Sequence, residues 1–324
     1  MKPDAFLRGN VFPGTDAVPY PRARADDRLP ADTWAMAQHP VGVRLEFLAD
    51  AAEVEIAYRT EALAEYRPGA GSSWSAWQGD RQLAEVPALA GTNSARIPLD
   101  GADAAAPVTV YLPYGMHPTV LAVRPSGGTL LPAPARPRWV CYGDSIAEGW
   151  VASSPSRSWP AIAARRWQLD VANLGYAGAA RGEIPSAEHI ASLPADVISI
   201  SYGTNCWTRV PFSAGMMTAV LDAFLRVIRA THPVVPIVVV SPVVRPAAES
   251  TPNVLGAGLR DLREAIERTA QSWIAAGDGA LELVRGGEIL RPEHLADGVH
   301  PDDGGHEIMA TVLGPRIAAA CARR

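Results

Sequence analysis

The pattern of apolar residues changes near residue 132, and this change constrains the fold more than any other feature. Before it, short segments alternate apolar and polar residues, with turn-rich Gly, Pro, Asp and Asn between them and no helical stretch. Such period-two alternation is typical of antiparallel strands with one buried face. Residues 1–131 are therefore predicted to form a jelly-roll-like β-sandwich domain. The alternating segments are residues 43–48, 53–58, 95–99, 108–112 and 120–123.

Residues 132–137 read Pro-Ala-Pro-Ala-Arg-Pro and are predicted to form a semi-rigid linker. Beyond it, over residues 138–324, strand-like apolar runs alternate with helical patterns. The run at residues 237–240 is apolar at every position, which indicates burial on both faces. The second domain is therefore predicted to be α/β, with a doubly wound parallel five-stranded sheet. Its predicted strands lie at about residues 138–142, 170–174, 196–202, 236–241 and 281–284.

A serine follows the first of these strands, and an aspartate and a histidine lie near the far end of the chain. Ser145 closes the triplet Gly-Asp-Ser, and Asp297 and His300 belong to the segment Asp-Gly-Val-His-Pro. A serine hydroxyl attacks poorly at neutral pH unless a base takes its proton, and an imidazole held by a carboxylate can do this. The three-residue step from Asp297 to His300 can bring the carboxylate to one ring nitrogen while the other faces Ser145.

Two more segments follow predicted strands. Gly175 comes after residues 170–174, and Asn205 closes the triplet Gly-Thr-Asn after residues 196–202. Ligands bind beyond the carboxyl ends of strands in sheets of this kind. Acyl transfer builds negative charge on the former carbonyl oxygen, which needs fixed donors. The Ser145 N–H, the Gly175 N–H and the Asn205 side-chain amide are predicted to supply them, because glycine at 175 lets the backbone approach a ligand.

Together these residues form four blocks in a fixed order, namely residues 143–145, Gly175, residues 203–205 and residues 297–300. This ordered set resembles the GDSL or SGNH hydrolase family, and the resemblance covers about residues 138–324. It implies an SGNH or flavodoxin-like sheet, a catalytic triad of Ser145, Asp297 and His300, and an oxyanion hole of Ser145, Gly175 and Asn205. The two-domain layout is similar to that of bacterial carbohydrate esterases with an N-terminal sandwich, and to that of GDSL acyltransferases. One departure is the segment Ile-Ala-Glu-Gly at residues 146–149, where many members have Leu or Ile, then Thr and a further polar residue.

Each of these residues has an alternative interpretation. Ser145 could only cap a helix, and Asn205 could only form a turn. His300 competes with His294, which lacks an aspartate at the right spacing, and with His306, which is predicted to open the last helix. The presence of all four blocks favours the catalytic interpretation.

Residues that flank the blocks are candidates for contact with the substrate. The alternative for Arg181 is an ion pair with Glu183 or a nearby carboxylate. Trp74 and Trp77 could stack on a sugar, but packing in the core or between the domains is favoured for tryptophans in a small sandwich. The predicted substrate contacts are Asp144, Glu148, Arg181 and Trp207.

Composition excludes several classes of partner. The net charge of −5 gives no electrostatic reason to expect nucleic acid or an anionic membrane. The chain has three widely spaced cysteines and lacks metal-ligand and phosphate-binding motifs, so we expect no metal or organic cofactor. No apolar stretch at the start suits a signal peptide and none reaches about 20 residues, so a cytoplasmic location is expected.

The sequence thus predicts a serine ester hydrolase that acts through an acyl-enzyme on the O-acyl ester of a carbohydrate or another small molecule. One alternative is a GDSL acyltransferase that moves an acyl group from a thioester or ester donor to a small-molecule hydroxyl. A second is a carbohydrate-binding protein whose hydrolase domain is inactive. The sequence indicates no oligomeric state and no particular acyl group.

Overall fold

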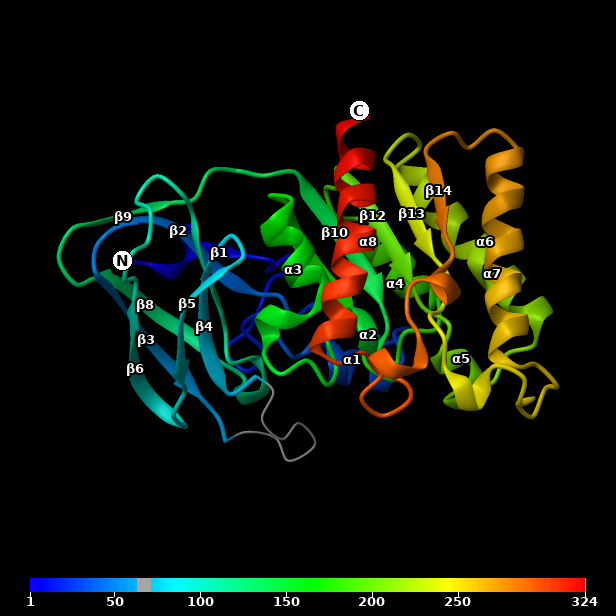
Figure 1. Ribbon diagram of the computed structural model, residues 1–324, viewed down its shortest axis with the longest axis horizontal. Helices are drawn as coiled ribbons and strands as arrows, with labels where there is room; N and C mark the ends of the chain where they lie inside the picture. Colours follow the sequence, from blue (N-terminus) through cyan, green and yellow to red (C-terminus); the bar gives the residue numbers. More distant parts are fainter. Residues whose placement is uncertain (63–70, 324) are drawn as a thin grey trace.

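The computed structural model describes residues 1–62 and 71–323, which form two adjoining bodies (Figure 1). The C-terminal body contains, within the described residues, five parallel strands in the order β11-β10-β12-β13-β14. This confirms the predicted doubly wound five-stranded sheet. The strands are β10 (Arg138–Gly143), β11 (Asp170–Gly175), β12 (Val197–Ser201), β13 (Ile237–Val240) and β14 (Leu281–Val284).

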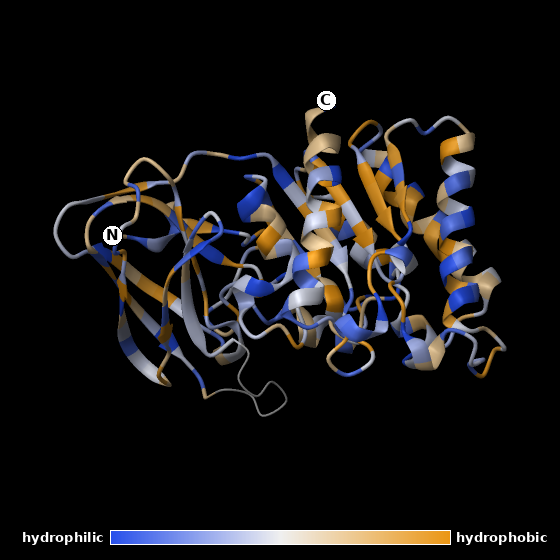
Figure 2. Ribbon diagram, viewed as in Figure 1, coloured by the Kyte–Doolittle hydropathy of each residue, from blue (hydrophilic) through white to orange (hydrophobic). Residues whose placement is uncertain are grey.

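Helices cover both faces of this sheet, which explains why β13 is apolar at every position. In β10, Trp139 and Cys141 pack toward one helical layer, whereas Val140 and Tyr142 pack toward the other. Figure 2 shows the apolar strands in orange between helices that carry hydrophilic residues on their outer faces. One layer contains α3 (Trp159–Arg166) and α8 (Asp303–Ala322), and the other contains α4 (Ile184–Ala191), α6 (Ala214–Thr231) and α7 (Leu259–Ala275).

The N-terminal body is antiparallel, as predicted. Strand β3 alternates in burial, so that its Val54, Ile56 and Tyr58 face the sandwich core. In the described chain, one sheet contains β1 (Leu7–Arg8), β2 (Arg44–Asp50), β4 (Ser73–Gln78), β5 (Arg81–Pro87), β7 (Val108–Tyr111) and β9 (Thr129–Pro132). The other contains β3 (Glu53–Thr60), β6 (Gly91–Pro98) and β8 (Thr119–Pro125).

The remaining described elements are short. Among them, α2 and α5 follow β10 and β12 directly. Within the described residues, no helix is both long enough and apolar enough to cross a membrane. The short elements are α1 (Ala31–Ala37), α2 (Ser145–Glu148), α5 (Asn205–Thr208) and the 3-10 helices Pro3–Ala5, Tyr114–Met116, Pro155–Arg157, Pro246–Ala248, Gly286–Glu288 and Pro292–His294.

The segment before β2 packs against the α/β body. Phe12, Ala23, Leu29 and Ala37 all belong to the apolar core that includes β10 and β12. The sequence assigned residues 1–131 to the sandwich as a whole, so these contacts differ from that assignment. The segment has few periodic apolar positions, and its partners lie more than a hundred residues further along the chain. The linker boundaries remain a prediction.

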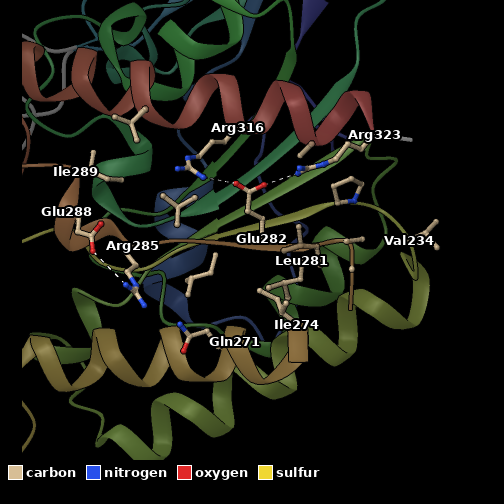
Figure 3. A pocket seen from close by; sticks show the side chains of 18 residues that line it. Val234, Gln271, Ile274, Leu281, Glu282, Arg285, Glu288, Ile289, Arg316 and Arg323 are labelled. Atoms are coloured by element: carbon tan, nitrogen blue, oxygen red, sulfur yellow. Dashed lines mark hydrogen bonds and ion pairs between the residues drawn. The ribbon is translucent and has the colours of Figure 1, made fainter. Parts of the chain in front are cut away.

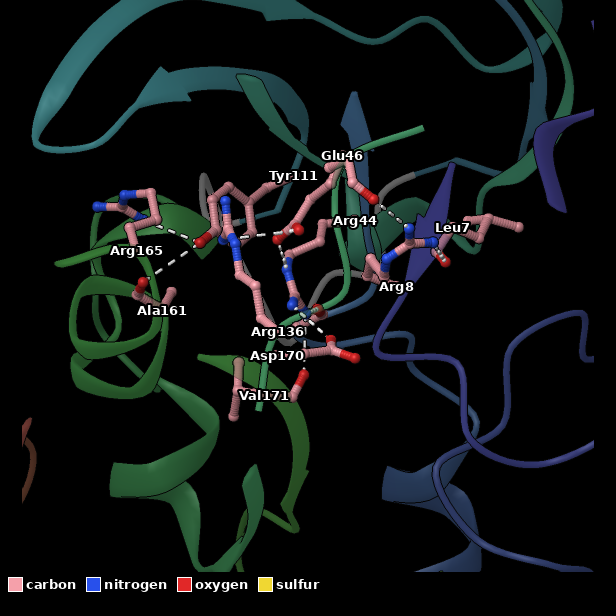
Figure 4. A network of polar contacts seen from close by, with 12 residues as sticks. Leu7, Arg8, Arg44, Glu46, Tyr111, Arg136, Ala161, Arg165, Asp170 and Val171 are labelled. Carbon is pink, nitrogen blue, oxygen red and sulfur yellow. Dashed lines mark hydrogen bonds and ion pairs between the residues drawn. The ribbon is translucent and has the colours of Figure 1, made fainter. Parts of the chain in front are cut away.

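A buried arginine joins the two bodies (Figure 4). Arg44 of β2 donates to Glu46 on its own strand at 2.7 Å and to Asp170 of β11 at 2.8 Å. It also donates to the carbonyl of Val171 at 2.8 Å. Burial acts to lower the pKa of Arg44, but the two carboxylates outweigh burial and raise it, so the side chain stays cationic. The network therefore fixes the edge strand β11 against the sandwich.

Candidate active site

The turn from β10 into α2 brings Ser145 to the carboxyl end of the sheet. Asp144 is the N-cap of α2, where its carboxylate accepts the Ile146 N–H at 3.0 Å. Gly143 allows the tight turn, because a Cβ there would lie 2.5 Å from the Cβ of Ala147. Ser145 is consequently the first helical residue and retains 6% exposure.

Three side chains from the two ends of the α/β domain form a continuous hydrogen-bonded chain. Ser145 Oγ lies 2.9 Å from His300 Nε2, and His300 Nδ1 lies 2.7 Å from Asp297 Oδ2. The other carboxylate oxygen of Asp297 accepts the backbone N–H groups of Val299 at 3.0 Å and His300 at 2.8 Å. The turn therefore holds the carboxylate through both oxygens, and the carboxylate holds the imidazole.

Electrostatics favour an ionised Asp297. Partial burial acts to raise the pKa of Asp297, but the hydrogen bonds from the side chain and backbone of His300 outweigh it, so the pKa is lowered. An ionised Asp297 keeps the proton on Nδ1 of His300 and leaves Nε2 to accept the proton of Ser145. Asp144 differs, because burial raises its pKa to about 6 despite the Ile146 N–H bond.

A cavity of about 310 Å³ contains the serine and the histidine. Its walls come from α1, α2, α5 and the loops that follow β11 and β13, so both the first segment of the chain and the α/β domain build it. Asn205 lines it, and Asp297 reaches it only through His300. The lining residues are Met36, Ser145, Trp150, Ala177, Gly178, Thr204, Asn205, Thr208, Arg209, Arg245, Val299 and His300.

The backbone donors in this cavity differ from those expected. The Gly175 N–H donates to the Asn173 side chain at 2.8 Å, and Gly175 is absent from the cavity lining. Gly175 has a packing role instead, because a Cβ there would lie 2.5 Å from the backbone nitrogen of Glu148. Gly178 lines the cavity in its place, with a φ of 70°. The sequence signal for Gly178 was a second glycine three residues after the first, beyond the end of the strand.

Donors are available beside the serine. The N–H groups of Ser145 and Gly178 have no acceptor among the described residues. The Asn205 amide donates one hydrogen to the carbonyl of Ala180 at 3.2 Å, which leaves its second hydrogen for a ligand. The described geometry therefore combines a serine, a histidine, an aspartate and up to three donors around one small cavity, as acyl transfer requires.

Comparison with known proteins agrees with this chemistry. The model of the GDSL-like lipase/acylhydrolase family matches residues 141–308, which contain all four sequence blocks. The chain belongs to this family. The predicted GDSL resemblance and the assignment as an acylhydrolase-type enzyme are thereby confirmed. No curated protein sequence matches the chain significantly.

Solved structures share both bodies of this GDSL-like protein. The salicylyl-acyltransferase SsfX3 from a tetracycline biosynthetic pathway has 27% identity and a TM-score of 0.82, over 98% of this chain and 94% of its own. A GDSL-like lipase candidate from Bacteroides ovatus has 19% identity and a TM-score of 0.79, over 97% and 95%. A family two carbohydrate esterase from Clostridium thermocellum, solved with cellohexaose, has 17% identity and a TM-score of 0.62, over 86% and 91%.

None of the four predicted substrate contacts lines the cavity of this GDSL-like domain. Asp144 caps α2, as described above. Glu148 is buried behind the cavity lining, where it accepts the N–H of the lining residue Ala177 at 2.7 Å and lies 3.5 Å from Arg22. The departure at residues 146–149 therefore affects the support of the cavity wall rather than its surface.

The other two candidates also have partners elsewhere. Arg181 pairs with Asp32 at 2.7 Å and with Glu183 at 3.3 Å, which corresponds to the alternative that the sequence left open. Trp207 donates through Nε1 to the carbonyl of Thr251 at 2.8 Å. Trp207 is nevertheless close to the cavity, because it packs against one of the lining arginines.

The tryptophans of β4 are packing residues. Trp74 is completely buried in the sandwich core. Trp77 packs with Tyr111 and Ala161 between the two bodies, and the Arg165 guanidinium lies 4.3 Å from its ring centroid. The structure supports the packing interpretation for both side chains.

A larger cavity lies away from this site, at the outer edge of β14 between α7 and α8 (Figure 3). Its volume is about 810 Å³, and Glu282 there pairs with Arg316 at 3.1 Å and Arg323 at 2.8 Å. None of the four sequence blocks lines this cavity. The chemistry of the lining, rather than the size of the cavity, therefore identifies the candidate site.

Proposed function

We propose that the protein is a serine ester hydrolase that acts through an acyl-enzyme formed on Ser145. The observation that carries this proposal is the hydrogen-bonded chain from Asp297 through His300 to Ser145, with contacts of 2.7 Å and 2.9 Å. This chain ends in a cavity that Gly178 and Asn205 also line. The arrangement supports acyl transfer because the nucleophile, the base and the oxyanion donors share one small volume.

In the first half-reaction, His300 Nε2 accepts the hydroxyl proton of Ser145 as Oγ bonds to the ester carbonyl carbon. The carbonyl oxygen becomes an oxyanion, which the N–H groups of Ser145 and Gly178 and the Asn205 amide stabilise. The imidazolium, oriented by Asp297, then donates its proton to the leaving alcohol as the C–O bond breaks. Water next loses a proton to His300, attacks the acyl-enzyme and releases the carboxylic acid with the serine hydroxyl restored.

A second candidate is acyl transfer to the hydroxyl of a small molecule. One observation favours it, namely the similarity of 27% identity over 98% of this chain to a salicylyl-acyltransferase. The same acyl-enzyme serves both outcomes, and the positioning of the acceptor decides between them. Hydrolysis leads because water needs no acceptor site. The third alternative, an inactive carbohydrate-binding protein, is disfavoured by the complete chain of hydrogen bonds.

A fluorophosphonate tests the nucleophile directly. We expect the wild-type protein to gain one adduct by intact-mass analysis and to hydrolyse 4-nitrophenyl esters of graded acyl length. Ser145→Ala should gain no adduct and lose turnover, while its free energy of unfolding changes by less than about 1 kcal/mol, because only one hydroxyl is removed. A wild-type protein that is folded but neither labelled nor active would refute the proposal.

Product analysis in the same reactions distinguishes the two acceptors. With a cleaved ester as donor and millimolar polyol or aromatic alcohol present, we expect free acid to be the main product. If new ester dominates in bulk water, the acyl-enzyme is formed but the protein is an acyltransferase rather than a hydrolase.

A further inference from the structure

Two arginines line the cavity that contains Ser145, and the described residues give neither of them a carboxylate partner. They are Arg209, at the end of α5, and Arg245, in the loop after β13. Arg263, which lies close to this loop, shows the usual arrangement, because it pairs with Glu249 at 2.6 Å. Two cations without acceptors therefore face a cavity of about 310 Å³.

Arg245 is held in place by an aromatic ring. Its guanidinium lies 4.9 Å from the ring centroid of Trp207, whose own Nε1 is anchored on the carbonyl of Thr251 at 2.8 Å. The Arg245 Nε is buried and has no hydrogen-bond partner among the described residues. Partial burial lowers the pKa of Arg245, while the charge of Asp297 acts to raise it. The stacked position orients the guanidinium and leaves its donors free for a ligand.

Arg209 lies beside Gly178, whose N–H is one of the proposed oxyanion donors. A Cβ built on Gly178 would be 3.5 Å from the Arg209 Nε. Arg209 is exposed, whereas Arg245 is half-buried, so the two cations differ in how strongly solvent screens them. A partly buried guanidinium with unpaired donors selects planar or tetrahedral oxyanions, since it binds carboxylate and phosphate through paired hydrogen bonds.

We propose that Arg209 and Arg245 form an anion subsite, and that the natural substrate carries a carboxylate or phosphate group close to its scissile acyl bond. The inference rests on the proposed function, because it names the substrate class for the Ser145 site. The anionic group can belong to the acyl part, to the alcohol or to a phosphorylated acyl donor. All three share the chemistry that two unpaired guanidinium groups recognise.

Matched pairs of esters test the subsite and distinguish the sources of the anion. The acyl-side pair is mono-4-nitrophenyl adipate and its methyl ester, which have the same leaving group. The alcohol-side set is 3-(acetoxymethyl)benzoate, its primary amide and 3-(acetoxymethyl)phenyl phosphate. We expect wild-type kcat/KM for at least one anionic ester to exceed that of its neutral partner by at least tenfold.

Variants then assign the preference to the arginines. Arg245→Gln should lower the anionic-to-neutral ratio of kcat/KM by at least tenfold, Arg209→Gln should lower it less, and Arg245→Lys should restore part of it. Arg260→Gln on α7 removes the same charge from an exposed side chain outside the cavity and should leave the ratio unchanged. If Arg245→Gln leaves the anionic-to-neutral ratio of kcat/KM unchanged, the proposal is overturned. An arginine that acted only on His300 would change kcat/KM of both esters by the same factor and would not change their ratio.

Calorimetry separates this inference from the proposed function. Ser145→Ala is titrated with 3-(acetoxymethyl)benzoate, with the matching phosphate and with the amide, so that binding is measured without turnover. Tighter binding of an anion by tenfold or more, lost in the Ser145→Ala/Arg245→Gln double variant, supports the subsite even if no ester is cleaved. Equal binding of the anions and the amide refutes the subsite even if Ser145 proves to be the nucleophile.

Discussion

Gly175, the last residue of β11, and Gly178, in the turn that follows it, have different tasks. The first makes room for the backbone of α2 and gives its N–H to Asn173. The second lines the cavity with an N–H that the described residues leave without an acceptor. Between them, the Ala177 N–H is held by the buried Glu148. The loop is therefore fixed just before Gly178, and just after it the Ala179 N–H donates to the carbonyl of Tyr176 at 3.1 Å, so the Gly178 N–H between them remains available to a ligand.

The Asn205 amide gives a test of this arrangement at the residue scale. Asn205→Ala should lower kcat by roughly 100-fold or more with little change in KM, since the amide bonds mainly to charge that develops in the transition state. Steady-state kinetics on a 4-nitrophenyl ester measure both constants. Asn93→Ala removes a similar amide from the sandwich and should leave both unchanged. A raised KM with an unchanged kcat would make Asn205 a substrate-binding residue instead.

Site residues could be predicted where the chemistry is local in sequence. Asp297 and His300 contact each other across a three-residue turn, so their spacing alone indicates the pair. Gly178 could not be selected over Gly175, because the choice depends on how the loop turns after the strand ends. Arg209 and Arg245 come from segments without a motif and meet the serine only through tertiary contacts.

At the scale of elements, α3 and α8 pack side by side, with their N-terminal ends next to each other. α8 begins at a capping aspartate, where the Asp302 carboxylate accepts the Gly305 N–H at 2.7 Å. One turn later, the fully buried His306 accepts the N–H of Trp159, the first residue of α3, through Nδ1 at 3.3 Å. Burial lowers the pKa of His306 to about 4, despite the opposing effects of Trp150 and nearby acids.

This buried histidine makes stability depend on pH. The pKa of His306 is about 4 in the folded protein, whereas an ordinary histidine has a pKa of 6.5, so between these values only the unfolded chain takes up the proton. The neutral imidazole therefore makes its full contribution to the free energy of unfolding above pH 6.5. This contribution falls by up to roughly 3 kcal/mol as the pH decreases to about 4. His306→Gln keeps an acceptor but cannot titrate, so its urea midpoints should decline less over this range.

The comparison needs a control for loss of a histidine. His232→Gln, at the half-buried end of α6, should follow the wild-type pH profile in the same urea titrations. Parallel profiles for wild type and His306→Gln would mean that another group causes the loss of stability in acid.

At the scale of the whole molecule, the sandwich and the α/β body are held together by buried polar groups as well as by apolar packing. Arg44 bridges Glu46 and Asp170, and all three are buried. Removal of one partner from such a network leaves charges buried without compensation, which costs more than the intact network contributes. The junction is therefore sensitive to single substitutions that would be tolerated on the surface.

Arg44→Met should lower the free energy of unfolding by up to about 3 kcal/mol, because it removes the buried cation between the two carboxylates and leaves Glu46 only Arg136 at 3.6 Å and Asp170 only Arg138 at 2.9 Å. Arg28→Met is the matched control, since the exposed Arg28 pairs with Asp26 and Glu188, each at 2.7 Å. We expect the control to lose much less stability, because solvent screens an exposed ion pair. Urea unfolding measures both, and equal losses would show that the junction does not depend on Arg44.

The two bodies of the fold could be predicted because the burial of a strand determines the spacing of its apolar residues in the sequence. Residues 53–58, which are buried on one face, alternate, and residues 237–240, which are buried on both faces, are apolar throughout. Residues 9–41 leave no such trace, since they are rich in turns and contain one short helix. Their place against the α/β core depends on contacts with residues far along the chain.

That long separation has a consequence for biosynthesis. Arg22 donates to the carbonyl groups of Asn173 and Gly175, which emerge from the ribosome more than 150 residues later. At about 5–20 residues per second, the early segment waits roughly 8–30 s for its partners. Met36 lines the cavity from this same segment. If translation stops before β11, the released chain therefore contains the sandwich together with an early segment whose apolar side chains are unburied. The cavity around the serine is completed only late in translation.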